Sequence, residues 1–151
     1  MPPIHRFTPR QRAIAAGYRS GLEEAVAGEL AALGIHATYE EDIIRYAVPA
    51  RPAKYTPDFK LPNGIIVETK GRFDTADRQK HILIKQQHPD LDIRFVFSNP
   101  RSRISKKSQT TYAMWCEKHG FLFAKVSVPE AWVFEATNHR SLEALRKAGL
   151  A

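Results

Sequence analysis

Two carboxylates and one amine stand close together in the chain, at Asp58, Glu68 and Lys70. Carboxylate oxygens, completed by water and a substrate phosphate, are the ligands that Mg²⁺ prefers. Such an ion polarises a phosphodiester and lowers the pKa of a bound water. A neighbouring lysine could orient or deprotonate the attacking water, or stabilise charge on the phosphorane. These residue types therefore suit the hydrolysis of a phosphodiester, provided that the fold brings them together.

The element that must bring them together is a predicted β-hairpin, whose turn is Pro-Asn-Gly at residues 62–64. Proline suits the second position of a type I turn, and glycine suits the left-handed residue that completes a three-residue loop. A three-residue loop places Asp58 directly opposite Glu68, so that the two side chains share a face. Lys70 lies two residues beyond Glu68 and projects from that same face. A two-residue Asn-Gly loop would instead turn Asp58 away from Glu68.

Two carboxylates this close repel each other unless a positive charge lies between them, and a divalent cation is the economical solution. The alternative is a surface strand pair in which Lys70 merely bridges the two acids. Two features favour the metal site. The apolar run 65–67 directly precedes Glu68, and Gly71 follows Lys70 at a point where a larger side chain could block a phosphate backbone.

The remaining elements mix helices and strands, which predicts an α/β fold with a mixed sheet. The first helix begins at Ser20 and stops at Gly34, and its apolar residues form one stripe. Residues 49–54 contain two prolines, so we expect a linker or crossing segment rather than the centre of a sheet. The other expected elements are strands at His36–Glu41, Ile43–Val48, Asp92–Ser98 and Phe121–Val126, helices from Thr75 to about His88 and at Thr110–His119, and a short final helix that includes Leu142, Leu145 and Arg146.

The hairpin also carries a known motif. Pro57-Asp58 followed by Glu68-Thr69-Lys70 reproduces the PD…(D/E)xK pattern of the restriction-endonuclease-like nucleases. A wider likeness, roughly from Tyr18 to Trp132, resembles the bacteriophage endonuclease I family, the small Holliday-junction resolvases of short-tailed coliphages. It is carried by the segments YRSGLEEAV, TYEED, VPA, YTPDF, LPNGI, VETKG, DRQKH, QHPDLDIRFVFS, CEKHG and PEAW, which occur in this order.

The resemblance implies a role for each site residue. Asp58 and Glu68 would bind a divalent metal, Mg²⁺ with Mn²⁺ as a substitute, and Lys70 would be the catalytic lysine. The main-chain carbonyl of Thr69 would also ligate the metal. Glu23 matches a glutamate of the family's first helix, which would help to hold a second ion or orient water. Spacing alone offers Glu23 a different role, because it completes a capping box with the Ser20 that begins the helix.

The resemblance further implies an intertwined, domain-swapped homodimer on a restriction-endonuclease-like mixed sheet flanked by helices. Residues 18–151 would form a single nuclease domain, and residues 48–54 would be the bridge to the partner subunit. Proline in a connector disfavours folding back and so suits an exchanged arrangement. Each site would then combine Glu23 of one chain with the hairpin residues of the other. Two such sites suit paired nicks across a four-way junction.

The charge of the chain points to a polyanionic partner. Its 151 residues carry 23 Lys and Arg against 16 Asp and Glu, a formal net charge of +7, which attracts nucleic acid at long range. Residues 1–17 are expected to be a flexible basic arm. The basic stretch 99–109 suits phosphate contacts without base reading, although a solvated loop explains it equally well. The candidate DNA-binding residues are Arg6, Arg10, Arg12, Arg72, Lys80, Arg101, Arg103, Lys106 and Lys107.

Several other kinds of site are not indicated. No apolar run is long enough to span a membrane, no secretory signal begins the chain, and a single cysteine, Cys116, excludes a disulfide framework. We therefore expect a cytoplasmic protein, in the host cell if it is phage-encoded. No Gly-rich phosphate loop is present, so no nucleotide cofactor is expected. The spacing of His81, His88 and His119 does not suit a metal, and they are interpreted as helix-surface or cap residues.

These observations lead to one functional hypothesis with two rivals. The hypothesis is a structure-selective, metal-dependent DNA endonuclease that resolves four-way (Holliday) junctions and other branched DNA, leaving 5′-phosphates as the resemblance implies. The first rival is a sequence-selective restriction-type nuclease on the same fold. The second rival is a basic DNA-binding or packaging protein that is not an enzyme. Cleavage of a four-way junction against linear duplex distinguishes the three.

Overall fold

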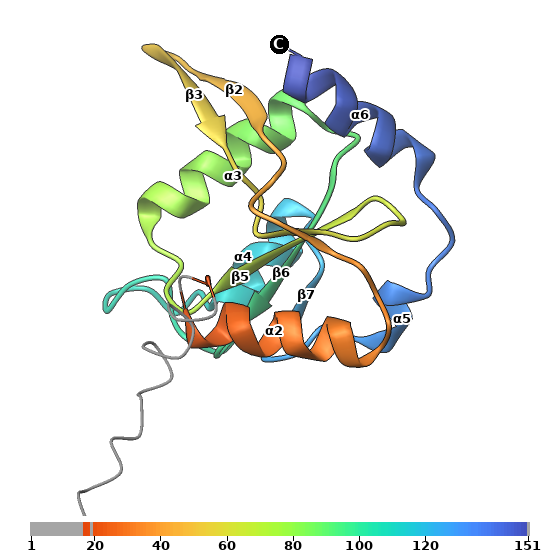
Figure 1. The fold of residues 1–151 in the computed structure, drawn as a ribbon. Helices are drawn as coiled ribbons and strands as arrows, with labels where there is room; N and C mark the ends of the chain where they lie inside the picture. Colours follow the sequence, from red (N-terminus) through yellow and green to blue (C-terminus); the bar gives the residue numbers. More distant parts are fainter. Residues whose placement is uncertain (1–16, 19, 151) are drawn as a thin grey trace, which may run out of the picture.

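A mixed five-stranded sheet forms the centre of the protein, as a computed structural model covering residues 17, 18 and 20–150 shows (Figure 1). The strand order is β1-β4-β5-β6-β7. β1, β4 and β5 pair in antiparallel fashion, whereas β5, β6 and β7 are parallel. The predicted α/β fold with a mixed sheet is therefore confirmed. The strands are β1 (Thr38–Tyr39), β4 (Phe59–Lys60), β5 (Ile65–Lys70), β6 (Asp92–Phe97) and β7 (Phe123–Lys125).

Helices cover both faces of this sheet. The helices are α2 (Gly21–Ala32), α3 (Thr75–Gln87), α4 (Tyr112–His119), α5 (Glu130–Val133) and α6 (His139–Leu150). Side chains of α2 and α5 pack in one apolar cluster with Val67 of β5, while α3, α4 and α6 pack in a second cluster with Ile66. Neighbouring residues of a strand point to opposite faces, so the two clusters lie on opposite sides of the sheet. Among the described residues (17, 18 and 20–150), no helix is both long and apolar enough to cross a bilayer.

The helix ends follow local signals in the sequence. The Ser20 hydroxyl accepts a hydrogen bond from the Glu23 N–H at 3.1 Å, which is the predicted N-cap of α2. α4 begins two residues later than expected because Thr111 caps it, and it ends at Gly120 in the left-handed conformation with φ +76°. The last helix, α6, is longer than the short helix that was predicted.

The hairpin turn has the predicted register. Phe59 pairs with Val67, and the Leu61 N–H donates to the Ile65 carbonyl at 2.8 Å across a three-residue loop. Gly64 has φ +92°, and an added Cβ would lie 2.8 Å from the carbonyl oxygen of Asn138. Both conditions demand glycine here. The two-residue loop, which would have separated Asp58 from Glu68, is thereby excluded.

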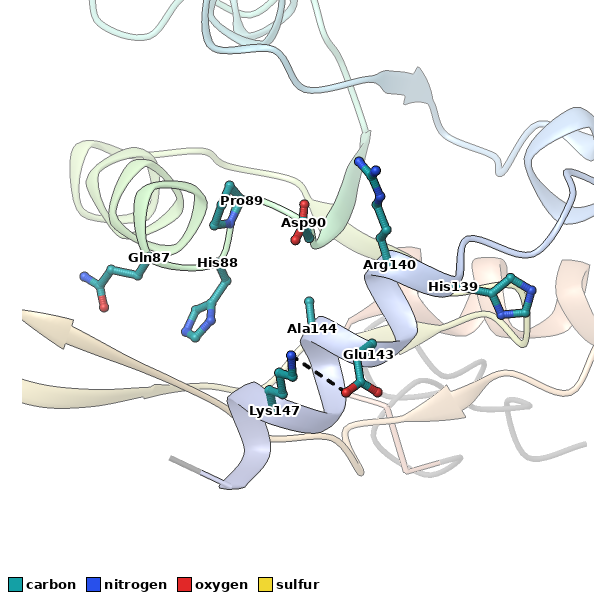
Figure 2. Close-up of a pocket in the computed structure, with 9 residues that line it drawn as sticks. All are labelled: Gln87, His88, Pro89, Asp90, His139, Arg140, Glu143, Ala144 and Lys147. Carbon is teal, nitrogen blue, oxygen red and sulfur yellow. Dashed lines mark ion pairs between the residues drawn. The ribbon is translucent and has the colours of Figure 1, made fainter.

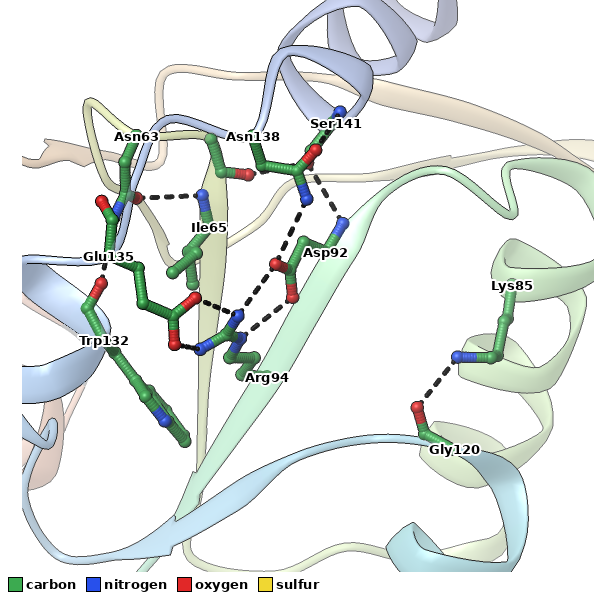
Figure 3. A network of polar contacts seen from close by, with 11 residues as sticks. Asn63, Ile65, Lys85, Asp92, Arg94, Gly120, Trp132, Glu135, Asn138 and Ser141 are labelled. Atoms are coloured by element: carbon green, nitrogen blue, oxygen red, sulfur yellow. Dashed lines mark hydrogen bonds and ion pairs between the residues drawn. The ribbon is translucent and has the colours of Figure 1, made fainter.

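The C-terminal segment braces this turn (Figure 3). The Asn63 side-chain amide donates to the Trp132 carbonyl at 2.9 Å, and the Ser141 hydroxyl donates to the Gly64 carbonyl at 2.6 Å. Beside them, the buried guanidinium of Arg94 pairs with the carboxylates of Asp92 and Glu135. The turn that sets the register is thus held by long-range bonds as well as by its own residues.

Residues 49–54 form a turn and most of one strand rather than a linker, but they lie outside the five-stranded sheet, as their prolines predicted. Strands β2 (Ile44–Val48) and β3 (Arg51–Tyr55) form a separate two-stranded antiparallel ribbon, in which Pro52 pairs with Ala47. Each strand of such a ribbon keeps one edge unpaired, so a proline is tolerated there. The ribbon folds back within this chain. Its exchange between two chains, with residues 48–54 as the bridge, stays a prediction.

The prediction for one histidine is wrong. His81 is fully buried rather than on a helix surface, because it lies on the face of α3 that packs against the sheet, between the rings of Tyr55 and Phe95. Burial lowers the pKa of its imidazole well below the usual value, so it is neutral. His88 does cap α3, as expected. The predicted arm, with Arg6, Arg10 and Arg12, lies outside the described residues except for Gly17.

Candidate active site

The hairpin and the start of α2 together form the candidate site. Asp58 lies at a bend just before β4 rather than inside a regular strand, while Glu68 and Lys70 belong to the end of β5. Glu23 lies in the first turn of α2, which packs against β5. All four residues named from the sequence are brought to one region of the molecule.

The Asp58 carboxylate is held by the neighbouring strand. Its Oδ2 accepts hydrogen bonds from both the main-chain N–H and the hydroxyl of Thr69, each at 2.8 Å. Burial nevertheless raises the pKa of Asp58 to about 7, and repulsion from Glu68 and Glu23 adds to the rise. Burial and the two neighbouring acids therefore disfavour the ionised form of Asp58. The predicted role of the Thr69 carbonyl as a metal ligand stays a prediction.

Glu68 is almost completely buried, with 4% of its surface exposed. Its Oε2 accepts a hydrogen bond from the Tyr55 hydroxyl at 2.5 Å and one from the Asp58 N–H at 3.3 Å. Its Oε1 lies 3.6 Å from Nζ of Lys70. Burial raises the pKa of Glu68, although Lys70 and the Tyr55 hydrogen bond oppose the rise.

The Lys70 ammonium lies between two acids. Its Nζ is 3.6 Å from Glu68 Oε1 and 3.4 Å from Oδ1 of Asp77, a residue of α3. Burial lowers the pKa of Lys70, but the carboxylates of Glu68, Asp77 and Asp58 outweigh that effect, so the net pKa is raised. The lysine is therefore protonated. Among its three possible roles, this favours stabilising charge or orienting water over accepting a proton.

Glu23 serves the helix cap and the site at the same time. Its main-chain N–H bonds to the Ser20 hydroxyl, and its buried carboxylate accepts hydrogen bonds from the hydroxyls of Ser20 and Tyr39. One oxygen of the Glu23 carboxylate lies within 4.8 Å of a carboxylate oxygen of Asp58 in the same chain. The predicted sharing of Glu23 between two subunits stays a prediction.

A further acid, Glu40, was missed by the sequence analysis. Glu23, Glu40 and Asp58 each offer a carboxylate oxygen, and these oxygens lie within 4.8 Å of one another. Glu40 has the left-handed φ of +49°, and its N–H donates to the Asp58 carbonyl at 3.1 Å. The only signal for it in the sequence was its place in the TYEED segment.

This donor set fits a hard divalent cation. All the candidate ligands are oxygens, which Mg²⁺ and Mn²⁺ prefer over nitrogen or sulfur. Asp58 is shared by two groups, one with Glu68 and one with Glu23 and Glu40. Burial is the main cause of the raised pKa of Asp58 and repulsion from Glu68 and Glu23 adds to it, so a cation bound here would stabilise the ionised carboxylate.

Comparisons with known proteins show the family of the chain. The family model of phage endonuclease I matches residues 5–149. The chain is 48% identical over 132 residues to Endonuclease I of Escherichia phage T7, covering 87% of this chain and 89% of that protein. It is 54% identical over 118 residues to Endodeoxyribonuclease 1 of Enterobacteria phage T3, covering 78% of each. The chain belongs to the phage endonuclease I family.

Basic residues of this family member lie in α3 and in the loops that follow β5 and β6, at the strand ends where Glu68 and Lys70 also lie. Because β5 and β6 are parallel, the loop after β6 emerges beside Lys70, and Figure 1 shows it near the start of α2. Lys80 is half-buried, with its Nζ 4.9 Å from the centre of the Tyr55 ring. The exposed residues here are Arg72, Arg101, Arg103, Lys106 and Lys107.

Two hollows on the described surface lie away from Asp58, Glu68 and Lys70. One of about 420 Å³ is formed where the end of α3 meets α6, and its lining includes Asp90, Arg140 and the ion pair of Glu143 with Lys147 (Figure 2). Another of about 570 Å³ lies between the β2–β3 ribbon and α3. Neither hollow is lined by Asp58, Glu68 or Lys70, so the chemistry of this family member is assigned by its charged groups rather than by cavity size.

Proposed function

We propose that this protein is a divalent-metal-dependent endonuclease that hydrolyses phosphodiester bonds in branched DNA, including four-way (Holliday) junctions. The observation that carries the proposal is the pair of the half-buried Asp58 and the buried Glu68, whose negative charge Lys70 only partly balances. The printed names of the two relatives, an endonuclease and an endodeoxyribonuclease, support DNA as the substrate.

The site residues divide the work among them. Asp58 and Glu68 would hold one cation, and Glu23 with Glu40 would hold a second one beside Asp58. When bound, the metal supplies Lewis-acid polarisation of the phosphodiester and a water of lowered pKa. Lys70, kept protonated by Glu68 and Asp77, stabilises negative charge that develops on the phosphorane and orients the attacking water.

A homodimer would give the enzyme two sites. In this proposal residues 48–54 exchange between subunits, so that Glu23 of one chain completes the site of the other. Two sites related by a two-fold axis would nick a four-way junction in a paired manner, leaving 5′-phosphates. The exposed basic loop after β6 would contact phosphates without reading bases, which suits recognition of DNA shape in the host cytoplasm.

A gel assay tests the proposal. The full chain is incubated with a labelled four-way junction or a linear duplex of the same sequence, in Mg²⁺, Mn²⁺ or EDTA. We expect cleavage of the junction alone, and only with metal. Asp58→Ala and Lys70→Ala should bind the junction as the parent does but not cut it, whereas Glu143→Ala, a change on the exposed face of α6, should cut normally.

Each other outcome selects a rival. Cutting of the duplex at a fixed sequence would favour a restriction-type nuclease. Junction binding by the parent without any metal-dependent cutting would favour a DNA-binding protein that is not an enzyme. Analytical ultracentrifugation of the same preparation tests the homodimer, and a monomer at assay concentration would contradict it.

A further inference from the structure

A buried tyrosine contacts the least exposed carboxylate of the site. Tyr55, the last residue of β3, has no exposed surface, and its hydroxyl donates a hydrogen bond to Glu68 Oε2 at 2.5 Å. The phenol is the donor in this contact, because a carboxylate oxygen can only accept.

The phenol and a main-chain amide together divide the two oxygens of this carboxylate. Oε2 of Glu68 is occupied by Tyr55 and, at 3.3 Å, by the Asp58 N–H. Oε1 lies on the side of Lys70, 3.6 Å from its Nζ. Two donors on one oxygen fix the plane of the carboxylate, so that its other oxygen is directed to the catalytic side.

The ring of Tyr55 is itself locked in place. Its centre lies 5.1 Å from the His81 ring in an edge-to-face contact, and the Lys80 ammonium lies over its face at 4.9 Å. His81 in turn packs edge-to-face on Phe95 of β6. A ring held on two sides cannot follow a moving carboxylate, so Glu68 must adopt the position that the tyrosine dictates.

We propose that Tyr55 is a positioning residue for the metal centre, which acts by orienting Glu68 as a ligand and which couples the β2–β3 ribbon to the active site. The inference rests on the proposed function, because Glu68 needs an orienting partner only if it ligates a metal. Groups that orient a metal ligand from behind are typically worth about 10–100-fold in metal affinity.

The test compares two buried tyrosines. Tyr55→Phe removes the hydroxyl that contacts Glu68, and Tyr112→Phe removes a buried hydroxyl that accepts the Phe73 N–H at 3.2 Å instead. Mn²⁺ affinity is measured by calorimetry, by titrating Mn²⁺ into the metal-free full chain without DNA. We expect Tyr55→Phe to weaken Mn²⁺ binding by about 10-fold or more and Tyr112→Phe by less than about 2-fold.

Kinetics add a second readout that lost stability alone would not reproduce. At limiting Mn²⁺ the junction-cleavage rate of Tyr55→Phe should fall about 10-fold, and saturating Mn²⁺ should restore it, while junction affinity in EDTA stays at the parent value. NMR of the metal-free parent should show a slowly exchanging, downfield hydroxyl proton on Tyr55, a measurement that does not depend on how either variant folds.

The outcomes separate this inference from the proposed function. Equal Mn²⁺ affinity in Tyr55→Phe and Tyr112→Phe, or a Tyr55 hydroxyl proton that exchanges as fast as an exposed one, overturns the positioning role while leaving the nuclease proposal intact. A parent that binds no Mn²⁺ and cuts no junction overturns both. Weaker Mn²⁺ binding in Tyr55→Phe but not in Tyr112→Phe supports the positioning role of Tyr55.

Discussion

Two clusters of charged side chains lie at opposite ends of β5 and β6, and they differ in how their charge is balanced. At the start of β6, the Arg94 guanidinium donates to both oxygens of Asp92 at 2.9 Å and both oxygens of Glu135 at 2.8 Å (Figure 3). Hydrogen bonding to Arg94 lowers the pKa of Glu135. The guanidinium carbon of Arg94 also lies over the Trp132 ring, 5.3 Å from its centre, in a cation–π contact.

At the other end, the acids respond in the opposite direction. Burial raises the pKa of both Asp58 and Glu68, and Lys70 does not offset it. The carboxylates are thus balanced by a cation in the cluster around Arg94, which we call the balanced cluster. In the cluster around Asp58 and Glu68, which we call the frustrated cluster, they are not. A cluster whose charge the chain balances stabilises the fold, whereas one that the chain leaves unbalanced requires an external partner, here a cation and a phosphate.

The largest expected effect is the loss of junction cleavage when the frustrated cluster loses one carboxylate. Asp58→Asn keeps the shape of the side chain and removes a metal ligand. Junction cleavage should fall by about a thousand-fold or more, because metal polarisation contributes several kcal/mol to the transition state. Single-turnover rates on a four-way junction measure the loss. Cleavage within ten-fold of the parent would remove Asp58 from the metal site.

Breaking the balanced cluster should damage stability instead. Arg94→Ala leaves the half-buried Asp92 and the exposed Glu135 without their cation, and losing hydrogen bonds to charged groups in this way costs about 1.5–3 kcal/mol. Urea unfolding measures the cost. The control, Arg146→Ala, breaks an exposed pair with Glu143 and should leave the free energy of unfolding nearly unchanged, because solvent screens such pairs. Equal effects of the two variants would contradict the comparison.

The frustrated cluster also predicts that the stability of the metal-free protein depends on pH. The folded pKa of Asp58, raised to about 7, lies above its unfolded value, so its contribution to stability is present at low pH and is lost as pH rises from about 4 to 7. A shift of this size is worth at most about 4 kcal/mol. Urea unfolding of the metal-free protein should show this decline, and Asp58→Asn should make it shallower, with the remainder coming from Glu68, whose pKa burial also raises. An unchanged decline in the variant would assign the effect to another group.

The smallest expected effect concerns the acid that sequence analysis missed. Glu40→Gln removes one of the three carboxylates that converge in this group with Glu23 and Asp58, and we expect Mn²⁺ affinity to fall by up to about 10-fold. Its exposed neighbour Glu41 provides the matched control, since Glu41→Gln makes the same change outside the group. Calorimetry that finds the two variants equal would exclude Glu40 from the site.

Local sequence was enough to predict the hairpin that presents the site. Pro-Asn-Gly at residues 62–64 determines its own turn, since proline presets one dihedral and Gly64 alone tolerates φ +92° beside Asn138. The register of Asp58 and Glu68 follows from that turn. The cap at Ser20 and the stop at Gly120 are equally local, because each satisfies orphaned helix-end groups with a neighbouring residue.

Contacts between distant segments were not predictable in this way. Sequence analysis placed His81 on a helix surface, and it did not place Tyr55 behind Glu68 or Asp77 beside Lys70. Glu40 likewise joins the site only because β1 pairs with β4. Periodicity reports which face of an element is apolar, but not which other element covers it.

The sequence by itself determined the chemistry available to this protein: a turn that sets two acids and a lysine in register, a surplus of basic residues, and a family motif around them. Only the tertiary structure decided which charges are balanced, because that depends on the burial and on the partners that α2, β1, β3 and α3 bring to the hairpin. Desolvation and Coulomb interactions act through space rather than along the chain, so the raised pKa of Asp58 exists only in the folded molecule.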